Sequence, residues 1–159
     1  MTTPQNKTIA FTVPGEPTAK GRARSTKSGR HYTPDKTARY ENLVKIIASQ
    51  AMSDAFPFTV SGVDEFSHKN DIERLFTGAV ILTFRAFFSV PESWSAKKKK
   101  SCLLGEIYPT KKPDIDNIEK ALLDGMNGVV WRDDVQVVDV IKSKRFGSPA
   151  RVEVEVTAL

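Results

Sequence analysis

The segment 80–88 restricts the fold of this chain more than any other part of the sequence. It reads Val-Ile-Leu-Thr-Phe-Arg-Ala-Phe-Phe, so almost every position is β-branched, aromatic or aliphatic, and Arg85 is its one charge. Such side chains favour β-strands, and apolar residues at both odd and even positions are typical of a strand covered on two sides. Pro91 follows and ends the run. The sequence therefore predicts a central strand that is buried on both faces.

The other regular patterns predict elements that surround this strand. Apolar residues recur at helical spacing up to Met52, behind Thr33 as a cap and Pro34 at the first helical position. The turn signal at 147–149 joins two strand candidates, which we expect to pair as a hairpin. Further helices are predicted over 96–104 and 117–126, and strands over 9–13, 135–145 and 151–156. This order indicates an α/β (α+β) fold, a mixed sheet of about four strands packed with helices.

Length and composition suit a single domain. The chain has 159 residues, which we interpret as one domain over 1–159, and segment 58–77 reads as an insertion or long loop. Its one cysteine, Cys102, excludes an internal disulfide and fits a reducing compartment. The longest apolar stretch, 79–90, contains Arg85 and is shorter than the roughly 20 residues of a membrane-spanning helix. We expect a cytoplasmic protein without membrane association.

Positive charge is concentrated in a few short segments. The formal net charge is +5, and segment 18–31 reads as a basic loop, or as a hairpin that turns at Ser28-Gly29. Clustered cations are typical of proteins that bind the phosphate backbone of nucleic acids, although a solvated basic surface or a mobile arm has the same composition. The candidate DNA-binding residues are Lys20, Arg22, Arg24, Lys27, Arg30, Lys97, Lys98, Lys111 and Lys112.

The most informative motif is the acidic segment 113–120. Asp114 and Asp116 lie two apart in an extended lead-in and should point to the same side. We expect Asp116 to cap the following helix, and Glu119 three residues on to complete a capping box. Lys120 and Asp124 follow Asp116 at steps of four, so the three share one helical face. The opposite face carries the apolar residues Ile118, Leu122 and Met126.

Neighbouring carboxylates suggest a metal site. Two close carboxylates repel each other unless a cation lies between them, and Mg²⁺ prefers oxygen ligands. The absence of His and Cys from the cluster argues against zinc. The acidic turn Asp133-Asp134 could fold back beside the first cluster, and Lys142 or Lys144 could reach a phosphate from the next strand. Each residue also has a structural explanation, as a cap, a helix-dipole partner, a turn residue or an exposed strand lysine.

These motifs together resemble a known family. The run Lys112-Pro113-Asp114-Ile115-Asp116-Asn117-Ile118-x-Lys120, then Asp124-Gly125, then Trp131-x-Asp133-Asp134-x-Gln136-Val137 resembles the RusA family of Holliday junction resolvases. The N-terminal Gly15-x-Pro17-x-x-Lys20-Gly21-Arg22-x-Arg24, with Tyr32-Thr33-Pro34 and Tyr40-Glu41, is similar to the phage and prophage branch of that family. The resemblance covers most of the chain, but segment 58–77 has no counterpart.

The resemblance implies an activity and a set of site residues. It implies a homodimer that makes paired cuts in four-way DNA junctions during recombination and repair. The implied cofactor is Mg²⁺, for which Mn²⁺ could substitute. By the same resemblance Asp114, Asp116 and Asp134 would bind metal, and Lys120 would be the essential lysine beside them. The supporting residues would be Asp133, Asp124 and Lys144.

Two other functions fit part of the pattern. A non-catalytic DNA-binding protein, such as a phage regulator, would have the same basic charge, but it would not need acids where phosphates approach. A nuclease for flaps or forks would share the whole motif. No Gly-rich phosphate loop is present, so we expect no nucleotide cofactor. Action in the bacterial cell or nucleoid, or a phage origin, fits each of the DNA-directed interpretations.

Overall fold

Strand β4 lies inside a mixed four-stranded sheet in the computed structural model, which describes residues 7–56 and 75–159. The strand order is β1-β6-β4-β5, with β4 antiparallel to β6 and parallel to β5, and β1 antiparallel to β6. The predicted α+β fold with a mixed sheet of four strands is confirmed. The strands are β1 (Thr8–Pro14), β4 (Val80–Phe88), β5 (Val137–Phe146) and β6 (Arg151–Ala158).

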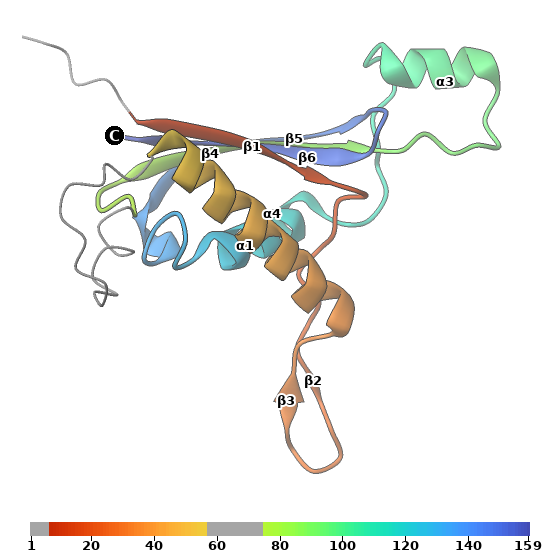
Figure 1. Cartoon of the computed structure of the whole chain (residues 1–159). Coiled ribbons are helices and arrows are strands. Elements are labelled where there is room, and N and C mark those ends of the chain that lie inside the picture. The colour runs from red at the N-terminus through yellow and green to blue at the C-terminus, as the bar shows by residue number, and fades with distance from the viewer. Residues whose placement is uncertain (1–6, 57–74) are drawn as a thin grey trace, which may run out of the picture.

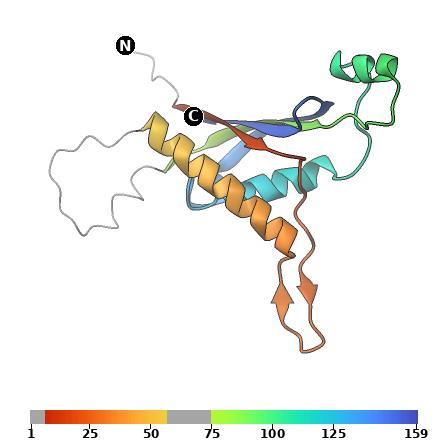
Figure 2. The same cartoon turned by 45° about the vertical axis from the view of Figure 1, so that its right-hand side comes forward.

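Two of the described helices lie on one face of this sheet. Figures 1 and 2 show α1 and α4 side by side beneath the strands, a narrow hairpin that projects away from the sheet, and α3 beyond one end of it. The hairpin confirms one of the two alternatives for the basic segment. The helices are α1 (Asp35–Ala55), α3 (Ala96–Leu103), α4 (Ile115–Met126) and the short 3₁₀ helix η1 (Asp134–Gln136), and the hairpin strands are β2 (Arg24–Ser25) and β3 (His31–Tyr32).

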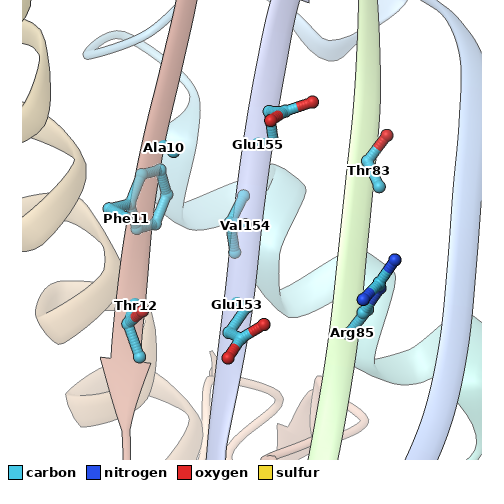
Figure 3. A pocket seen from close by; sticks show the side chains of 8 residues that line it. All are labelled: Ala10, Phe11, Thr12, Thr83, Arg85, Glu153, Val154 and Glu155. Carbon is cyan, nitrogen blue, oxygen red and sulfur yellow. The ribbon is translucent and has the colours of Figure 1, made fainter.

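Strand β4 is fully buried on one face only, so the prediction of burial on both faces is wrong. Alternate residues from Val80 to Phe88 are buried, whereas the residues between them are partly or fully exposed. The reason is that α1 and α4 cover the same side of the sheet. Figure 3 shows the other side, where Arg85 lies beside Glu153 of β6 with α4 behind the strands. The pocket that Arg85 and Glu153 help to line therefore lies on the opposite side of the sheet from α4.

Strands β5 and β6 do not pair, so the predicted hairpin between them is also wrong. Strand β4 is inserted between the two, and the connecting turn crosses its end. At this crossing the backbone N–H of Gly147 donates to the carbonyl of Phe88 at 2.9 Å. A Cβ atom at Gly147 would lie 2.7 Å from the ring of Phe87, so only glycine allows this close approach. The turn signal was correct, but it serves a crossover connection.

Helix α1 begins one residue later than a cap at Thr33 would require. Pro34 occupies the cap position, and no side chain caps the helix. Its buried residues include Tyr40 and Val44, as the helical spacing predicts, and also Ala48 and Met52. Among the described residues, no helix is both long and apolar enough to cross a membrane.

Two predicted features remain, the segment 58–77 and the helix over 96–104. The segment 58–77, interpreted as an insertion or long loop, lies mostly outside the described residues. Its described end includes Phe76, which is buried and forms an isolated bridge with Trp131. Helix α3 has Ser95 as its cap, with the hydroxyl accepting from the backbone N–H of Lys98, and the predicted stop at Gly105 has a positive φ.

Candidate active site

Helix α4 begins at Ile115, so the predicted cap at Asp116 is wrong. Asp114 occupies the cap position with an extended backbone, and its carbonyl accepts the backbone N–H of Ile118 at 3.1 Å. Asp116 therefore lies in the first helical turn, and no side chain caps the helix. Glu119 does not form the expected capping box and instead pairs with Lys142 of β5. The extended lead-in ends at Asp114, because the helix already begins at Ile115, so it does not hold both acids.

The helical face predicted for α4 is nevertheless present. Ile118, Leu122 and Met126 are fully buried, which turns the opposite face of the helix outward. Asp114 and Asp116 are exposed at its start, where the positive end of the helix dipole stabilises a carboxylate. Within the described part of the chain, neither of these two side chains forms a hydrogen bond or an ion pair. Both are thus available to a ligand.

Lys144 of β5 supports the segment that enters α4. Its ammonium group donates hydrogen bonds to the backbone carbonyls of Lys111 and Pro113, the latter at 3.0 Å. It also lies 5.0 Å from the ring centroid of Phe88. Burial lowers the pKa of Lys144, and the charge of Lys111 lowers it further, while the carboxylate of Asp114 opposes both. Of the two strand lysines considered, Lys144 is therefore the one that contacts the lead-in to the acids.

The 3₁₀ helix η1 positions Asp134. Asp133 caps it, accepting the backbone N–H of Val135 at 3.1 Å, and Gln136 completes a capping box. The amide of Gln136 also donates to the carbonyls of Phe76 at 2.7 Å and Gly78 at 3.0 Å. The capping box expected in α4 thus occurs in η1. It ties the acidic turn to the chain that precedes β4.

Lys120 connects α4 with η1. Its ammonium group lies 3.0 Å from Oδ1 of Asp124 and 3.3 Å from Oδ2 of Asp134. The hydrogen bond to Asp124 raises the pKa of Lys120, burial opposes this, and the contact with Asp134 adds to the rise. Lys120 therefore stays protonated at neutral pH. The predicted approach of the second acidic turn to the face of α4 is seen at this lysine.

Asp124 has a second lysine partner that the sequence did not suggest. Lys20 places its ammonium group 2.9 Å from Oδ2 of Asp124 and 2.5 Å from Oε1 of Glu41. Glu41 and Gln136 had no predicted role beyond their place in the family pattern. The available signal was Gly125, since a glycine inside a helix often marks close packing against a neighbour.

A comparison with known protein families shows which family this chain belongs to. The model of the RusA endodeoxyribonuclease family matches residues 14–157. The chain belongs to the RusA family. It is also 35% identical over 151 residues to the uncharacterized protein YqaN of Bacillus subtilis strain 168, covering 92% of this chain and 93% of that protein. RusA-family membership implies endonuclease activity on branched DNA, specifically Holliday junctions, and the family generally depends on divalent metals.

The acids of this RusA-family chain have the chemistry of a hard-metal site, although they do not form a closed set of ligands. Among the residues described, no group of three or more His, Cys, Asp or Glu side chains could hold a metal ion. The donors at the start of α4 are carboxylate oxygens, which Mg²⁺ prefers, and Asp134 has Lys120 as its partner. The donor type fits Mg²⁺, and the ligand role of Asp114, Asp116 and Asp134 stays a prediction.

The predicted DNA-binding residues lie on or beside the hairpin, on α3 and in the lead-in to α4. The exposed side chains of the hairpin, α3 and the lead-in to α4 carry the charges, and Lys98 also lies 3.6 Å from the ring centroid of Trp94. Lys20 differs from the others because it is engaged in ion pairs at the base of the hairpin. The exposed members are Arg22, Arg24, Lys27 and Arg30 on the hairpin, Lys97 and Lys98 on α3, and Lys111 and Lys112 before α4.

Proposed function

We propose that this protein is a Mg²⁺-dependent endodeoxyribonuclease that resolves four-way DNA junctions by paired, symmetric cuts during recombination and repair. The observation that carries the proposal is the contact between Lys120 and Asp134. It brings an acid from η1 and a lysine from α4 together on the helical face that begins at Asp116, in a chain of the RusA family. We place this activity in the bacterial cytoplasm or nucleoid, on chromosomal or phage DNA.

The acids and the lysine would have different tasks in phosphodiester hydrolysis. Asp114, Asp116 and Asp134 would hold the divalent ion, with Mn²⁺ as a substitute for Mg²⁺. When bound, such an ion supplies Lewis-acid chemistry and lowers the pKa of a water molecule. The ammonium of Lys120 donates hydrogen bonds to the oxygens of the scissile phosphate and offsets the charge that develops there. Lys120 suits this task because Asp124 helps to keep it protonated.

The arrangement of charges favours a nuclease over a simple DNA-binding protein. Exposed carboxylates repel the phosphates of DNA unless a cation lies between them. Asp114 and Asp116 form no ion pair among the described residues, while exposed basic side chains lie on the hairpin and in the lead-in to α4. A protein that only binds DNA would gain affinity by losing these two acids. Their presence supports catalysis.

A homodimer follows from the symmetry of the proposed substrate. A four-way junction has approximate two-fold symmetry, and a dimer with C2 symmetry presents two identical sites to it. Each subunit of the dimer then needs only one set of acids and makes one of the two cuts. We therefore propose that two copies act together on one junction.

The decisive experiment compares DNA substrates of different shape. Purified protein is incubated with labelled four-way, three-way, flap, fork and linear duplex DNA, each with and without Mg²⁺. Symmetric cuts that depend on Mg²⁺ and occur mainly in the four-way junction would support the proposal. Preferential cutting of flaps or forks would change the substrate, and binding without any cutting would indicate the non-catalytic alternative.

A further inference from the structure

A continuous series of ion pairs lies along the polar face of α4. Five charged groups of alternating sign belong to α1, the segment before the hairpin, α4 and η1. Successive ammonium and carboxylate atoms lie 2.5, 2.9, 3.0 and 3.3 Å apart. The groups are, in order, Glu41, Lys20, Asp124, Lys120 and Asp134.

We propose that Lys20, Glu41 and Asp124 are positioning residues for DNA cleavage. They hold the ammonium of Lys120 in place and fix the base of the β2–β3 hairpin to the polar face of α4. This inference rests on the proposed nuclease function and assigns to Lys20 a role other than direct contact with DNA.

Asp124 is restrained from both sides. Its Oδ1 receives Lys120 and its Oδ2 receives Lys20, so each oxygen has one lysine partner. Burial raises the pKa of Asp124, but the hydrogen bonds from Lys20 and Lys120 lower it below its ordinary value overall. Loss of Lys20 would leave one oxygen without its cation and allow the carboxylate to rotate. Lys120 would then lose a partner with a fixed direction.

Exposure also separates the positioning residues from the lysine that they hold. The side chains of Lys20, Glu41 and Asp124 are 28%, 19% and 20% exposed, whereas that of Lys120 is 52% exposed. A phosphate can approach Lys120 far more easily than Lys20. The gradient favours a contact with DNA at Lys120 and a supporting role for the other three.

The backbone around Lys20 joins the hairpin to both helices. The backbone N–H of Lys20 donates to the carbonyl of Asn117 in α4, and that of Gly21 donates to the hydroxyl of Thr37 in α1, each at 2.9 Å. A Cβ atom at Gly21 would lie 2.6 Å from the Thr37 hydroxyl, so glycine permits this contact. The hairpin thus starts from a point beside Asp116, the neighbour of Asn117. A DNA strand held at the base of the hairpin would thus lie near the start of α4.

Close packing of α1 against α4 makes the network possible. A Cβ atom at Gly125 would lie 2.7 Å from the Cβ of Val44 and 3.1 Å from the carbonyl of Glu41. The missing side chain lets α1 approach α4 at the residue next to Asp124. Glu41 is thereby brought within reach of Lys20.

A double-mutant cycle on the cleavage rate tests the coupling. Single-turnover rates are measured with protein in excess over a four-way junction for Lys20→Met, Asp124→Asn, Glu41→Gln and the Lys20→Met/Asp124→Asn double variant. Each single change should slow cleavage by about tenfold, as for partners that orient a catalytic group. The double variant should be no slower than the slower single variant. An additive loss of about hundredfold would show independent action and overturn the proposal.

Controls separate positioning from DNA binding and from unfolding. Lys20→Arg keeps the charge and should retain most of the rate, and Lys45→Met removes an exposed lysine of α1 and should change nothing. Junction affinity without metal should change less than about twofold in Lys20→Met, since a positioning residue acts on the rate. A loss confined to affinity would make Lys20 a DNA contact and overturn the proposal. Thermal unfolding of every variant confirms that it is folded.

A spectroscopic measurement tests the positioning without any need for activity. The ammonium ¹H–¹⁵N signal of Lys120 is recorded at one fixed pH in the free protein and assigned with Lys120→Arg. Lys20→Met and Asp124→Asn should each shift or broaden this signal, because Lys120 loses a fixed partner. An unchanged signal in both variants overturns the proposal. Absence of cutting by the unaltered protein would instead contradict the proposed nuclease function, and the signal would still decide the positioning.

Discussion

The aspartates at the start of α4 differ from those farther along the chain in the partners of their side chains. Asp114 and Asp116 at the start are exposed and have no side-chain partner among the described residues, whereas Asp124 and Asp134 are each in contact with Lys120. The positive end of the helix dipole favours the first pair, and this effect fades within one turn. Acids farther along need lysines instead. The comparison separates Asp114 and Asp116, whose side chains are free to bind a ligand, from Asp124, which lysines hold on both oxygens, while Asp134 combines a lysine partner with a proposed metal-binding role.

The largest expected effect concerns the unpaired acids. Asp114→Asn or Asp116→Asn should slow cleavage by roughly hundredfold or more, because each removes a carboxylate that we propose holds the divalent ion at the scissile phosphate. Junction binding should persist, and raising the Mg²⁺ concentration should restore little of the rate. The matched control is Asp35→Asn, an exposed acid in the first turn of α1. Full activity of both active-site variants would remove the distinction between the two groups of acids.

A slightly smaller effect is expected at the lysine shared by the paired acids. Lys120→Met should lower the single-turnover rate by about hundredfold and junction affinity much less, because its hydrogen bonds strengthen as charge develops on the phosphate. Lys142→Met, at a neighbouring lysine paired with Glu119, serves as the comparison. Equal losses in the two variants would mean that any nearby lysine has this effect. A loss in affinity alone would make Lys120 a DNA contact.

Gly125→Ala should disturb the paired acids through packing. The new methyl group would lie 2.7 Å from Val44, and overpacking of this kind costs about 1–3 kcal/mol. Better helix propensity of alanine, about 1 kcal/mol, offsets part of this loss. Urea denaturation should show lower stability, and the cleavage rate should fall because α1 moves away. Gly78→Ala is the control, since nothing lies within 4 Å of its added atom.

The exposed hairpin should affect binding more than chemistry. Arg24→Ala and Lys27→Ala should each weaken junction binding several-fold and reduce the slope of log affinity against log salt by about one, as expected for one lost phosphate contact. Binding titrations at several salt concentrations measure both quantities. An unchanged salt slope in both variants would place the DNA elsewhere, on α3 or the lead-in to α4.

The smallest expected effect is a dependence of the free energy of unfolding on pH. The pKa of Asp124 is lowered from its ordinary 3.8 in the folded protein. Its ion pairs therefore stabilise the fold above that value, and the contribution is lost as pH falls through the lower, folded pKa. The stability difference between the natural protein and Asp124→Asn should be present near neutral pH and vanish in strong acid. Urea denaturation at a series of pH values measures it, and a difference that persists in acid would contradict the ion-pair explanation.

Local sequence patterns predicted the helices and strands better than they predicted which of these elements lie next to each other in space. Helical spacing located α1 and α4 and the buried row at Ile118, Leu122 and Met126, because a helix presents every third or fourth residue on one side. The same spacing placed Asp116, Lys120 and Asp124 together. The pairing of β5 with β6 and the covering of both faces of β4 were predicted wrongly, because both depend on which strand inserts and where helices pack.

By itself, the sequence determined the elements, the RusA pattern of acids and the polar face of α4. These follow from backbone periodicity and from residues close together in the chain. Only the tertiary structure decided that Lys20, Glu41 and Asp134 meet at that face. The contact of Glu41 with Lys20 joins segments far apart in the chain and depends on the close approach of α1 and α4 at Gly125. Such a distance is set by packing, which no local pattern encodes.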